Sequence, residues 1–145
     1  MIAIDANIFL EVILKQDKFE ECKEFLKLVN EGKLKAIVSA FTVDAILLAM
    51  ERKKMSQDDM KNFVLSLMKY KELYNYPNQN PEKMWAVEFM KKYNLDFEDA
   101  LTLECALQSE CKEIVSLDKH FNRVTEIKRL TPKEAVVKYG KEKNK

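Results

Sequence analysis

Apolar residues follow two patterns along this chain, and each pattern predicts a different kind of element. Short, nearly continuous apolar runs are typical of strands that are buried on both faces of a parallel sheet. Such runs, together with one aromatic-rich segment, predict strands at residues 1–5, 34–38, 72–76, 113–117 and 124–130. Because these runs alternate with longer segments, the chain is predicted to be an α/β protein.

The longer segments carry apolar residues at intervals of three and four, which is the spacing of one helical face. They predict helices at residues 6–14, 17–32, 40–54, 57–71, 82–94, 97–110 and 131–140. Ser39 and Ser56 stand where N-caps are expected. In the fifth of these helices we expect Trp85, Val87 and Phe89 on the inner face. The order of the elements favours a parallel sheet with helices on both of its faces.

Composition narrows the classes of function. A chain of 145 residues can form one domain with a sizeable core, and we expect residues 131–145 to be a helix and basic tail of the same domain as residues 1–130. The formal net charge is +1, so contact with nucleic acid would have to come from local patches. With only two glycines the chain has no glycine-rich phosphate loop, which excludes P-loop and dinucleotide-binding proteins.

The cysteines and the single histidine do not suggest a catalytic or zinc site, and the apolar runs do not suggest a membrane span. Cys22, Cys105 and Cys111 have no zinc-ligand spacing, so reduced thiols are expected. His120, the only histidine, is interpreted as a surface or capping residue. The chain opens directly on a predicted strand, and no apolar run approaches the roughly 20 residues that span a bilayer. We therefore expect a cytoplasmic protein with no membrane partner.

Four aspartates stand almost alone inside apolar segments, although 34% of the residues are charged. They are Asp5, Asp44, Asp99 and Asp118, and only Asp118 has a basic neighbour in sequence. Burying a carboxylate without a partner costs several kcal/mol, so such acids are usually paired or bound to a cation. Taken singly, each could be a turn or helix acid. Taken together, they suggest a shared metal site.

The predicted topology brings these acids towards one edge of the sheet. Asp5 and Asp118 end predicted strands, and ligands of open α/β sheets bind outside the carboxyl ends of the strands. Asp44 lies in the first turns of the helix after the second strand, and Asp99 lies at the start of the helix before the fourth. Oxygen ligands suit Mg²⁺ or Mn²⁺, which need only a few carboxylates because they keep several waters.

Four motifs in this order resemble those of the PIN domain, and most closely the VapC-type toxin ribonucleases. The family opens with a strand ending in D-x-N, as at Asp5 and Asn7. Its second motif is an acid in a helix after a strand ending in V-S, as at Ser39 and Asp44, although the family usually has Glu there.

The last two motifs lie in the second half of the chain. An acid followed by Ala at a helix start is matched by Asp99, with Asp96 and Glu98 as rivals for the same role. A strand ending in S/T-x-D-x-x-F is matched by Ser116 and Asp118. The resemblance covers residues 1–130. It implies a three-layer α/β/α PIN-like fold with a central parallel sheet of four to five strands.

The resemblance also implies roles for the acids and their neighbours. Asp5, Asp99 and Asp118 would hold Mg²⁺ or Mn²⁺, and Asp44 would share the ion or reach it through water. Three residues would orient ligands and water or cap a helix, namely Asn7, Ser116 and Asp96. All four acids, Asp5, Asp44, Asp99 and Asp118, are thus candidate catalytic residues.

The function implied by the resemblance is a metal-dependent endoribonuclease, the toxin of a toxin–antitoxin pair. Its partners would be RNA, a small antitoxin protein and a second copy of the chain. The surplus of apolar residues in the helices at 40–54 and 56–71 suggests that a homodimer is built on them. Three alternatives stay open: a PIN nuclease of RNA processing or decay without an antitoxin, a degenerate PIN domain that only binds protein, and a phosphohydrolase of another α/β fold.

Overall fold

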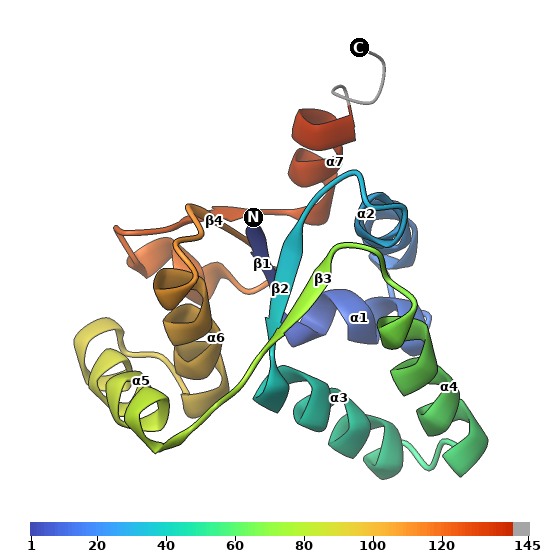
Figure 1. Ribbon diagram of the computed structural model, residues 1–145, viewed down its shortest axis with the longest axis horizontal. Coiled ribbons are helices and arrows are strands. Elements are labelled where there is room, and N and C mark those ends of the chain that lie inside the picture. The colour runs from blue at the N-terminus through green and yellow to red at the C-terminus, as the bar shows by residue number, and fades with distance from the viewer. Residues whose placement is uncertain (141–145) are drawn as a thin grey trace.

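A five-stranded parallel sheet forms the centre of the molecule in a computed structural model that describes residues 1–140 (Figure 1). The strands are β1 (Ile2–Ile4), β2 (Ala36–Ser39), β3 (Leu73–Tyr76), β4 (Glu113–Val115) and β5 (Lys128–Leu130). Their order across the sheet is β3-β2-β1-β4-β5. All pairings are parallel, and β1 lies between β2 and β4. The predicted parallel sheet of four to five strands is confirmed, with five.

Eight helical elements surround the sheet in residues 1–140. They are α1 (Ala6–Ile13), α2 (Phe19–Asn30), α3 (Ala40–Arg52), α4 (Gln57–Met68), α5 (Asn80–Tyr93), α6 (Phe97–Gln108), the 3₁₀-helix η1 (Lys119–Arg123) and α7 (Pro132–Gly140). Each predicted helix is present, and η1 replaces what the sequence suggested was only a turn. The part of the predicted basic tail at 141–145 lies outside the described residues. No helix within residues 1–140 is long and apolar enough to cross a membrane.

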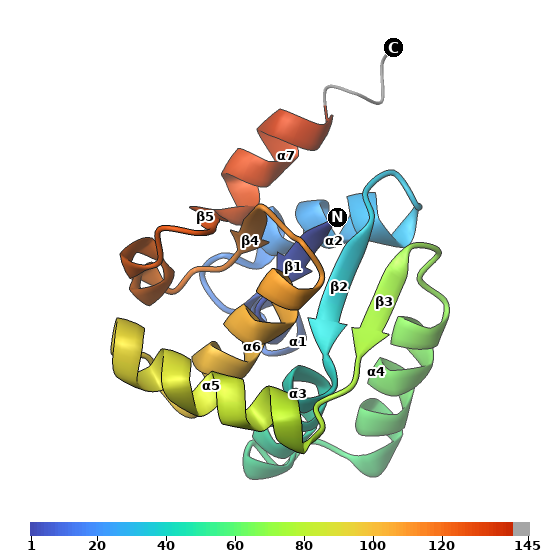
Figure 2. The same ribbon diagram turned by 60° about the vertical axis from the view of Figure 1, so that its left-hand side comes forward.

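Two hydrophobic cores cover the two faces of the sheet. Ile2 and Ile4 of β1 point into a core with α1, α2, α3 and α4, whereas Ala3 points into a core with α5 and α6. Successive strand residues point to opposite faces, so three consecutive apolar residues serve both cores. Figures 1 and 2 show α5 and α6 on one side of the sheet and α1 and α2 on the other, which makes three layers.

The inner face predicted for α5 is partly wrong. Trp85 is 51% exposed and Val87 is 53% exposed, whereas Ala86 and Tyr93 are buried and Phe89 is partly buried. Helix α5 lies outermost in its layer and packs mainly on α6, so only a narrow stripe is covered. The stripe runs through positions 86, 89, 90 and 93, which are three and four residues apart, and it leaves the largest side chain outside.

Side chains at the helix starts confirm the predicted caps. The Ser39 hydroxyl accepts a hydrogen bond from the Thr42 backbone N–H at 3.2 Å, and the Ser56 hydroxyl accepts one from Asp59 at 3.0 Å. Each satisfies a backbone donor that has no partner within its helix. The cap at Ser39 turns the chain directly from β2 into α3, so this helix starts at the carboxyl edge of the sheet.

Candidate metal centre

Asp5 follows β1 immediately and caps α1, which places its carboxylate at the carboxyl edge of the sheet. The side chain is buried, and Oδ1 accepts a hydrogen bond from the Ala6 backbone N–H at 2.8 Å. Oδ2 accepts two more, from the Ser116 hydroxyl at 2.6 Å and from the Asn7 amide at 2.9 Å. Asn7 and Ser116 therefore hold Asp5 in one orientation.

The same two residues join β1 to the loop after β4. The Leu117 backbone N–H donates to Asn7 Oδ1 at 3.3 Å, and the Asp118 backbone N–H donates to Ser116 Oγ at 2.9 Å. The Leu117–Asn7 and Ser116–Asp5 bonds link residues 110 and 111 positions apart, so they depend on the parallel pairing of β1 with β4, whereas the Asp118–Ser116 bond is local. Asn7 and Ser116 thus both contact Asp5, and their predicted role of orienting a metal ligand stays a prediction.

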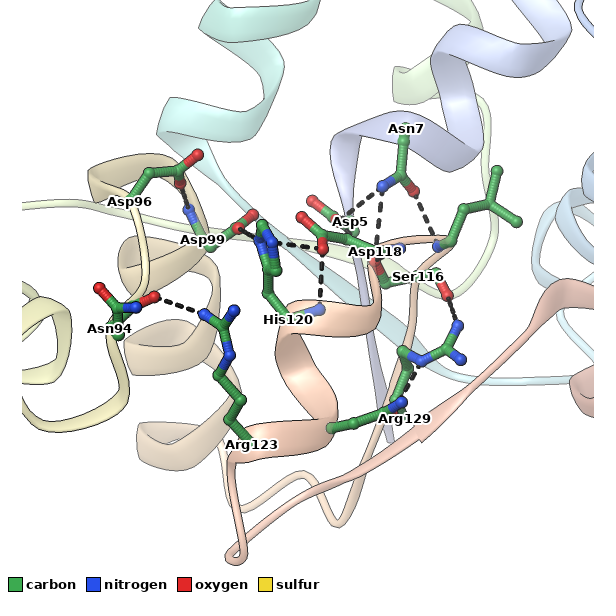
Figure 3. A network of polar contacts seen from close by, with 12 residues as sticks. Asp5, Asn7, Asn94, Asp96, Asp99, Ser116, Asp118, His120, Arg123 and Arg129 are labelled. Atoms are coloured by element: carbon green, nitrogen blue, oxygen red, sulfur yellow. Dashed lines mark hydrogen bonds and ion pairs between the residues drawn. The ribbon is translucent and has the colours of Figure 1, made fainter.

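Asp99, Asp118 and His120 point towards one another at this edge (Figure 3). Asp118 caps η1, and its Oδ1 lies 3.1 Å from His120 Nδ1. Asp99 lies in the first turn of α6, and its Oδ2 lies 3.7 Å from the same nitrogen. One ligand atom from each residue lies within 4.8 Å of the others. Asp96 caps α6 by accepting from the Asp99 backbone N–H at 2.8 Å, as the sequence suggested.

Burial and mutual repulsion act on the acids of this group. Burial, together with the nearby charges of Glu98 and Asp118, raises the pKa of Asp5 to about 6, against the hydrogen bonds from Ser116 and Ala6. Burial raises the pKa of Asp99 to about 8, with further increases from the charges of Asp5, Asp96 and Asp118. The ionised forms are therefore costly at neutral pH unless a positive charge is present.

The donor set fits a divalent cation. Asp99 is only 6% exposed, and its Oδ2 is one of few buried side-chain oxygens in residues 1–140 that lack a hydrogen-bond partner. A buried carboxylate oxygen without a donor has lost its hydration without replacement, and a bound cation would compensate for that loss. Asp118 offers a further oxygen in the same group, and Asp5 lies near enough for its charge to act on Asp99. Carboxylate oxygens are the ligands that Mg²⁺ and Mn²⁺ prefer.

Asp44 does not join this group. It is exposed on α3 and borders a shallow surface pocket with Leu47, Leu48, Glu51 and Met60. The inward side of α3 is marked by Thr42 and Ile46, both buried. A residue two positions from each of them lies about 200° around the helix, so Asp44 points away from this core. Asp5, Asp99 and Asp118 lie near enough for their charges to act on one another, and the part of Asp44 in the centre stays a prediction.

Glu98 and two arginines border the centre. The sequence analysis named Glu98 only as a rival of Asp99 and did not predict the arginines. The charge of Glu98 acts on Asp5, and the pKa of Glu98 itself is raised by burial and by Asp96. Arg129 donates from Nη1 to the Ser116 carbonyl at 2.9 Å, and Arg123 donates from Nη1 to the Asn94 carbonyl at 2.6 Å (Figure 3). The adjacent acids Glu98 and Asp99 were the sequence signal that could have indicated Glu98, whereas no local pattern indicated the arginines.

Fold and site together define an α/β protein with a carboxylate centre at the carboxyl edge of its sheet. The model of the PIN domain family matches residues 1–120. The chain therefore belongs to the PIN domain family, as its motifs suggested. A search of curated proteins finds no match.

Solved structures with the same fold include toxins and toxin–antitoxin complexes. A toxin–antitoxin complex from Klebsiella pneumoniae has a TM-score of 0.69 and 15% identity, over 91% of this chain and 98% of that chain. VapC20 of Mycobacterium tuberculosis, described as a toxin that cleaves the sarcin-ricin loop, has a TM-score of 0.69 and 11% identity, over 88% and 99%. VapBC2 of Rickettsia felis, bound to promoter DNA, has a TM-score of 0.69 and 14% identity, over 90% and 98%. At these identities the likeness is one of fold.

Proposed function

We propose that this protein is a metal-dependent endoribonuclease. The observation that carries the proposal is the buried Asp99 carboxylate, whose Oδ2 has no hydrogen-bond partner and faces Asp118 and His120 beside Asp5. A domain that only bound proteins would gain nothing from several costly acids at one edge, and this argues against the degenerate alternative. The phosphohydrolase alternative is set aside because the chain belongs to the PIN domain family.

Each residue of the centre has a distinct part in the proposed reaction. Asp5, Asp99 and Asp118 would hold Mg²⁺ or Mn²⁺, which when bound supplies positive charge and an activated water for attack on a phosphodiester. Asn7 and Ser116 fix the Asp5 carboxylate, so that its free lone pairs keep one direction. Arg129 and Arg123 flank the acids with positive charge that can balance the phosphates of a substrate. Asp44 remains a proposed contributor only through water or a second bound group.

RNA is the proposed substrate, and an antitoxin is the proposed partner. VapC20, with the same fold, is described as a toxin that cleaves the sarcin-ricin loop. A second similar structure, from Klebsiella pneumoniae, is described as a toxin–antitoxin complex. These likenesses support a toxin role for this chain over the alternative of a nuclease in RNA processing without an antitoxin.

Chelation tests the proposed function. Purified protein is expected to cleave a structured RNA in the presence of Mg²⁺ or Mn²⁺ and to lose that activity completely in EDTA, because the acids repel phosphate when no cation is bound. The measurement is the appearance of RNA fragments on a denaturing gel, and added Mn²⁺ should restore it. Cleavage at full rate in EDTA would contradict the metal-dependent reaction.

We also propose that the chain forms a homodimer built on α3 and α4. Of the apolar residues that suggested it, Ile46, Met50 and Phe63 are buried in the core, whereas Leu48 is 51% exposed and Met68 is 75% exposed. Light scattering at tens of micromolar is expected to give about twice the chain mass of 17.0 kDa. Met68→Lys should lower that mass, since a charge cannot be buried cheaply at an apolar contact. A strictly monomeric wild-type chain would refute this proposal.

A further inference from the structure

We infer that His120 is a nitrogen ligand of the metal centre and that it makes the centre favour borderline cations, such as Co²⁺ and Zn²⁺, over Mg²⁺. This inference rests on the proposed metal-dependent function and adds to it. It assigns an imidazole to a centre otherwise made of carboxylates. This assignment differs from the prediction made from the sequence, which placed His120 only on the surface or at a cap.

The position of the imidazole is the first observation. His120 Nδ1 lies between two carboxylates, 3.1 Å from Asp118 Oδ1 and 3.7 Å from Asp99 Oδ2. Ligands at about 2.1 Å from one ion, and at angles of 90° to 110° to one another, are about 3.0–3.5 Å apart. The separations in the structure are close to that range. The side chain can therefore share one ion with both acids with little movement.

The buried Asp99 oxygen is the second observation. Asp99 Oδ2 is buried, has no hydrogen-bond partner, and is aimed at the imidazole (Figure 3). A separation of 3.7 Å is too long for a hydrogen bond, so the imidazole alone does not satisfy this oxygen. An ion between the two would satisfy both. An ordinary surface histidine would leave the buried oxygen without a partner.

The backbone supports the placement of the ring. The His120 backbone N–H donates to Asp118 Oδ1 at 2.8 Å, so the cap of η1 fixes the main chain of both residues. The side chain of His120 is 52% exposed, and its ring can rotate locally to present Nδ1. Replacing the side chain leaves the backbone cap in place. A truncation at this position is therefore expected to change the ligand set without unfolding η1.

Ligand chemistry gives the selectivity. Imidazole nitrogen suits Zn²⁺ and the later first-row ions, whereas Mg²⁺ prefers oxygen ligands and keeps its waters. Most sites bind Co²⁺ more tightly than Mg²⁺ because of the general order of affinities, so that preference by itself says little. The informative quantity is how much of the Co²⁺ affinity depends on His120, compared with the Mg²⁺ affinity.

Metal titration by calorimetry tests the inference on tag-free protein. His120→Ala is expected to weaken Co²⁺ and Zn²⁺ binding at least about tenfold and to change Mg²⁺ binding less than about twofold. Asp99→Asn is the comparison variant, and it should weaken all three ions. Equal loss of Mg²⁺ and Co²⁺ affinity in His120→Ala, or no loss of either, would overturn the inference and leave the proposed function intact. Absence of any metal binding to the wild-type protein would overturn both.

Nuclear magnetic resonance of the wild-type protein gives a second reading that needs no variant. His120 is the only histidine, so the imidazole ¹⁵N signals of the labelled chain belong to one ring. Diamagnetic Zn²⁺ should shift the Nδ1 signal and leave a proton on Nε2, while Mg²⁺ at saturation should leave Nδ1 nearly unchanged. If the imidazole ¹⁵N signals do not shift when Zn²⁺ binds, the ring is not a ligand, and the inference is rejected.

Discussion

Replacement of Asp99 by asparagine is expected to reduce ribonuclease activity at least about a hundredfold while the chain stays folded. Asparagine keeps the shape of the side chain but removes the negative charge from a carboxylate that faces Asp118 and His120. Loss of a residue that only orients a ligand already costs 10- to 100-fold in many metal sites, so loss of a ligand should cost at least as much. RNA cleavage rates at saturating Mn²⁺, with circular dichroism to verify folding, provide the measurement.

Two other acids provide matched controls for that replacement. Asp96→Asn should have a milder effect, because Asp96 caps α6 through Oδ1 and asparagine caps nearly as well. Asp44→Asn should leave most of the activity, because Asp44 is exposed and is not among the charges that shift the pKa of Asp5 or Asp99. An inactive Asp96→Asn beside an active Asp99→Asn would reverse the assignment of the third ligand. An inactive Asp44→Asn would show that Asp44 belongs to the metal centre.

Stability of the metal-free protein is expected to fall as pH rises from about 5 to about 8, which is opposite to the acid denaturation of many proteins. Burial raises the pKa of Asp5 to about 6, and burial with nearby acids raises the pKa of Asp99 to about 8. In the unfolded chain both ionise near their ordinary value of 3.8. Between pH 3.8 and its folded pKa, each acid stays protonated in the folded protein but is ionised in the unfolded chain. The free energy of unfolding therefore falls as pH rises through this range, until the pH exceeds the folded pKa. The expected decline is on the order of 1 kcal/mol per pH unit.

Chemical denaturation across this pH range, with and without saturating Mn²⁺, measures the effect. Mn²⁺ binds the ionised acids, so the decline should disappear or reverse when the metal is present. Asp99→Asn should flatten the metal-free profile and make that variant more stable than wild type at pH 8, whereas Asp44→Asn should follow the wild type. Burial raises the pKa of Glu104 to about 6, so Glu104 adds to the decline below about pH 6 in every variant. The pKa of Glu113 is lowered by Lys138 and Tyr139 against the effect of burial, so Glu113 titrates below this window. A metal-free stability that rises between pH 5 and 8 would contradict the raised pKa values of Asp5 and Asp99.

Stability and function are thus opposed at this edge of the sheet. The acids that are expected to bind metal are the same acids that destabilise the metal-free fold at neutral pH. Protein structures commonly carry such local costs at functional sites and compensate for them elsewhere. Here the compensation comes from a core in which β1 is buried on both faces.

The sequence by itself determined the fold class, the five strands and the helices, because buried parallel strands and helical faces leave local apolar patterns. It also identified Asp5, Asp99 and Asp118, since the position of each after a strand or at a helix start is a local feature. Even the cap at Asp96 could be predicted. These features depend on residues that are neighbours in the chain, so they can be recognised without a structure.

Only the tertiary structure decided which side chains meet. Asp44 is exposed on α3, and the narrow contact of α5 with α6 leaves Trp85 exposed although its spacing predicted an inner position. His120 gave no signal in sequence, because its meeting with Asp99 requires η1 and the start of α6 to be packed together. Such contacts arise from the angles between elements, which the pattern of apolar residues does not encode at the precision of one side chain.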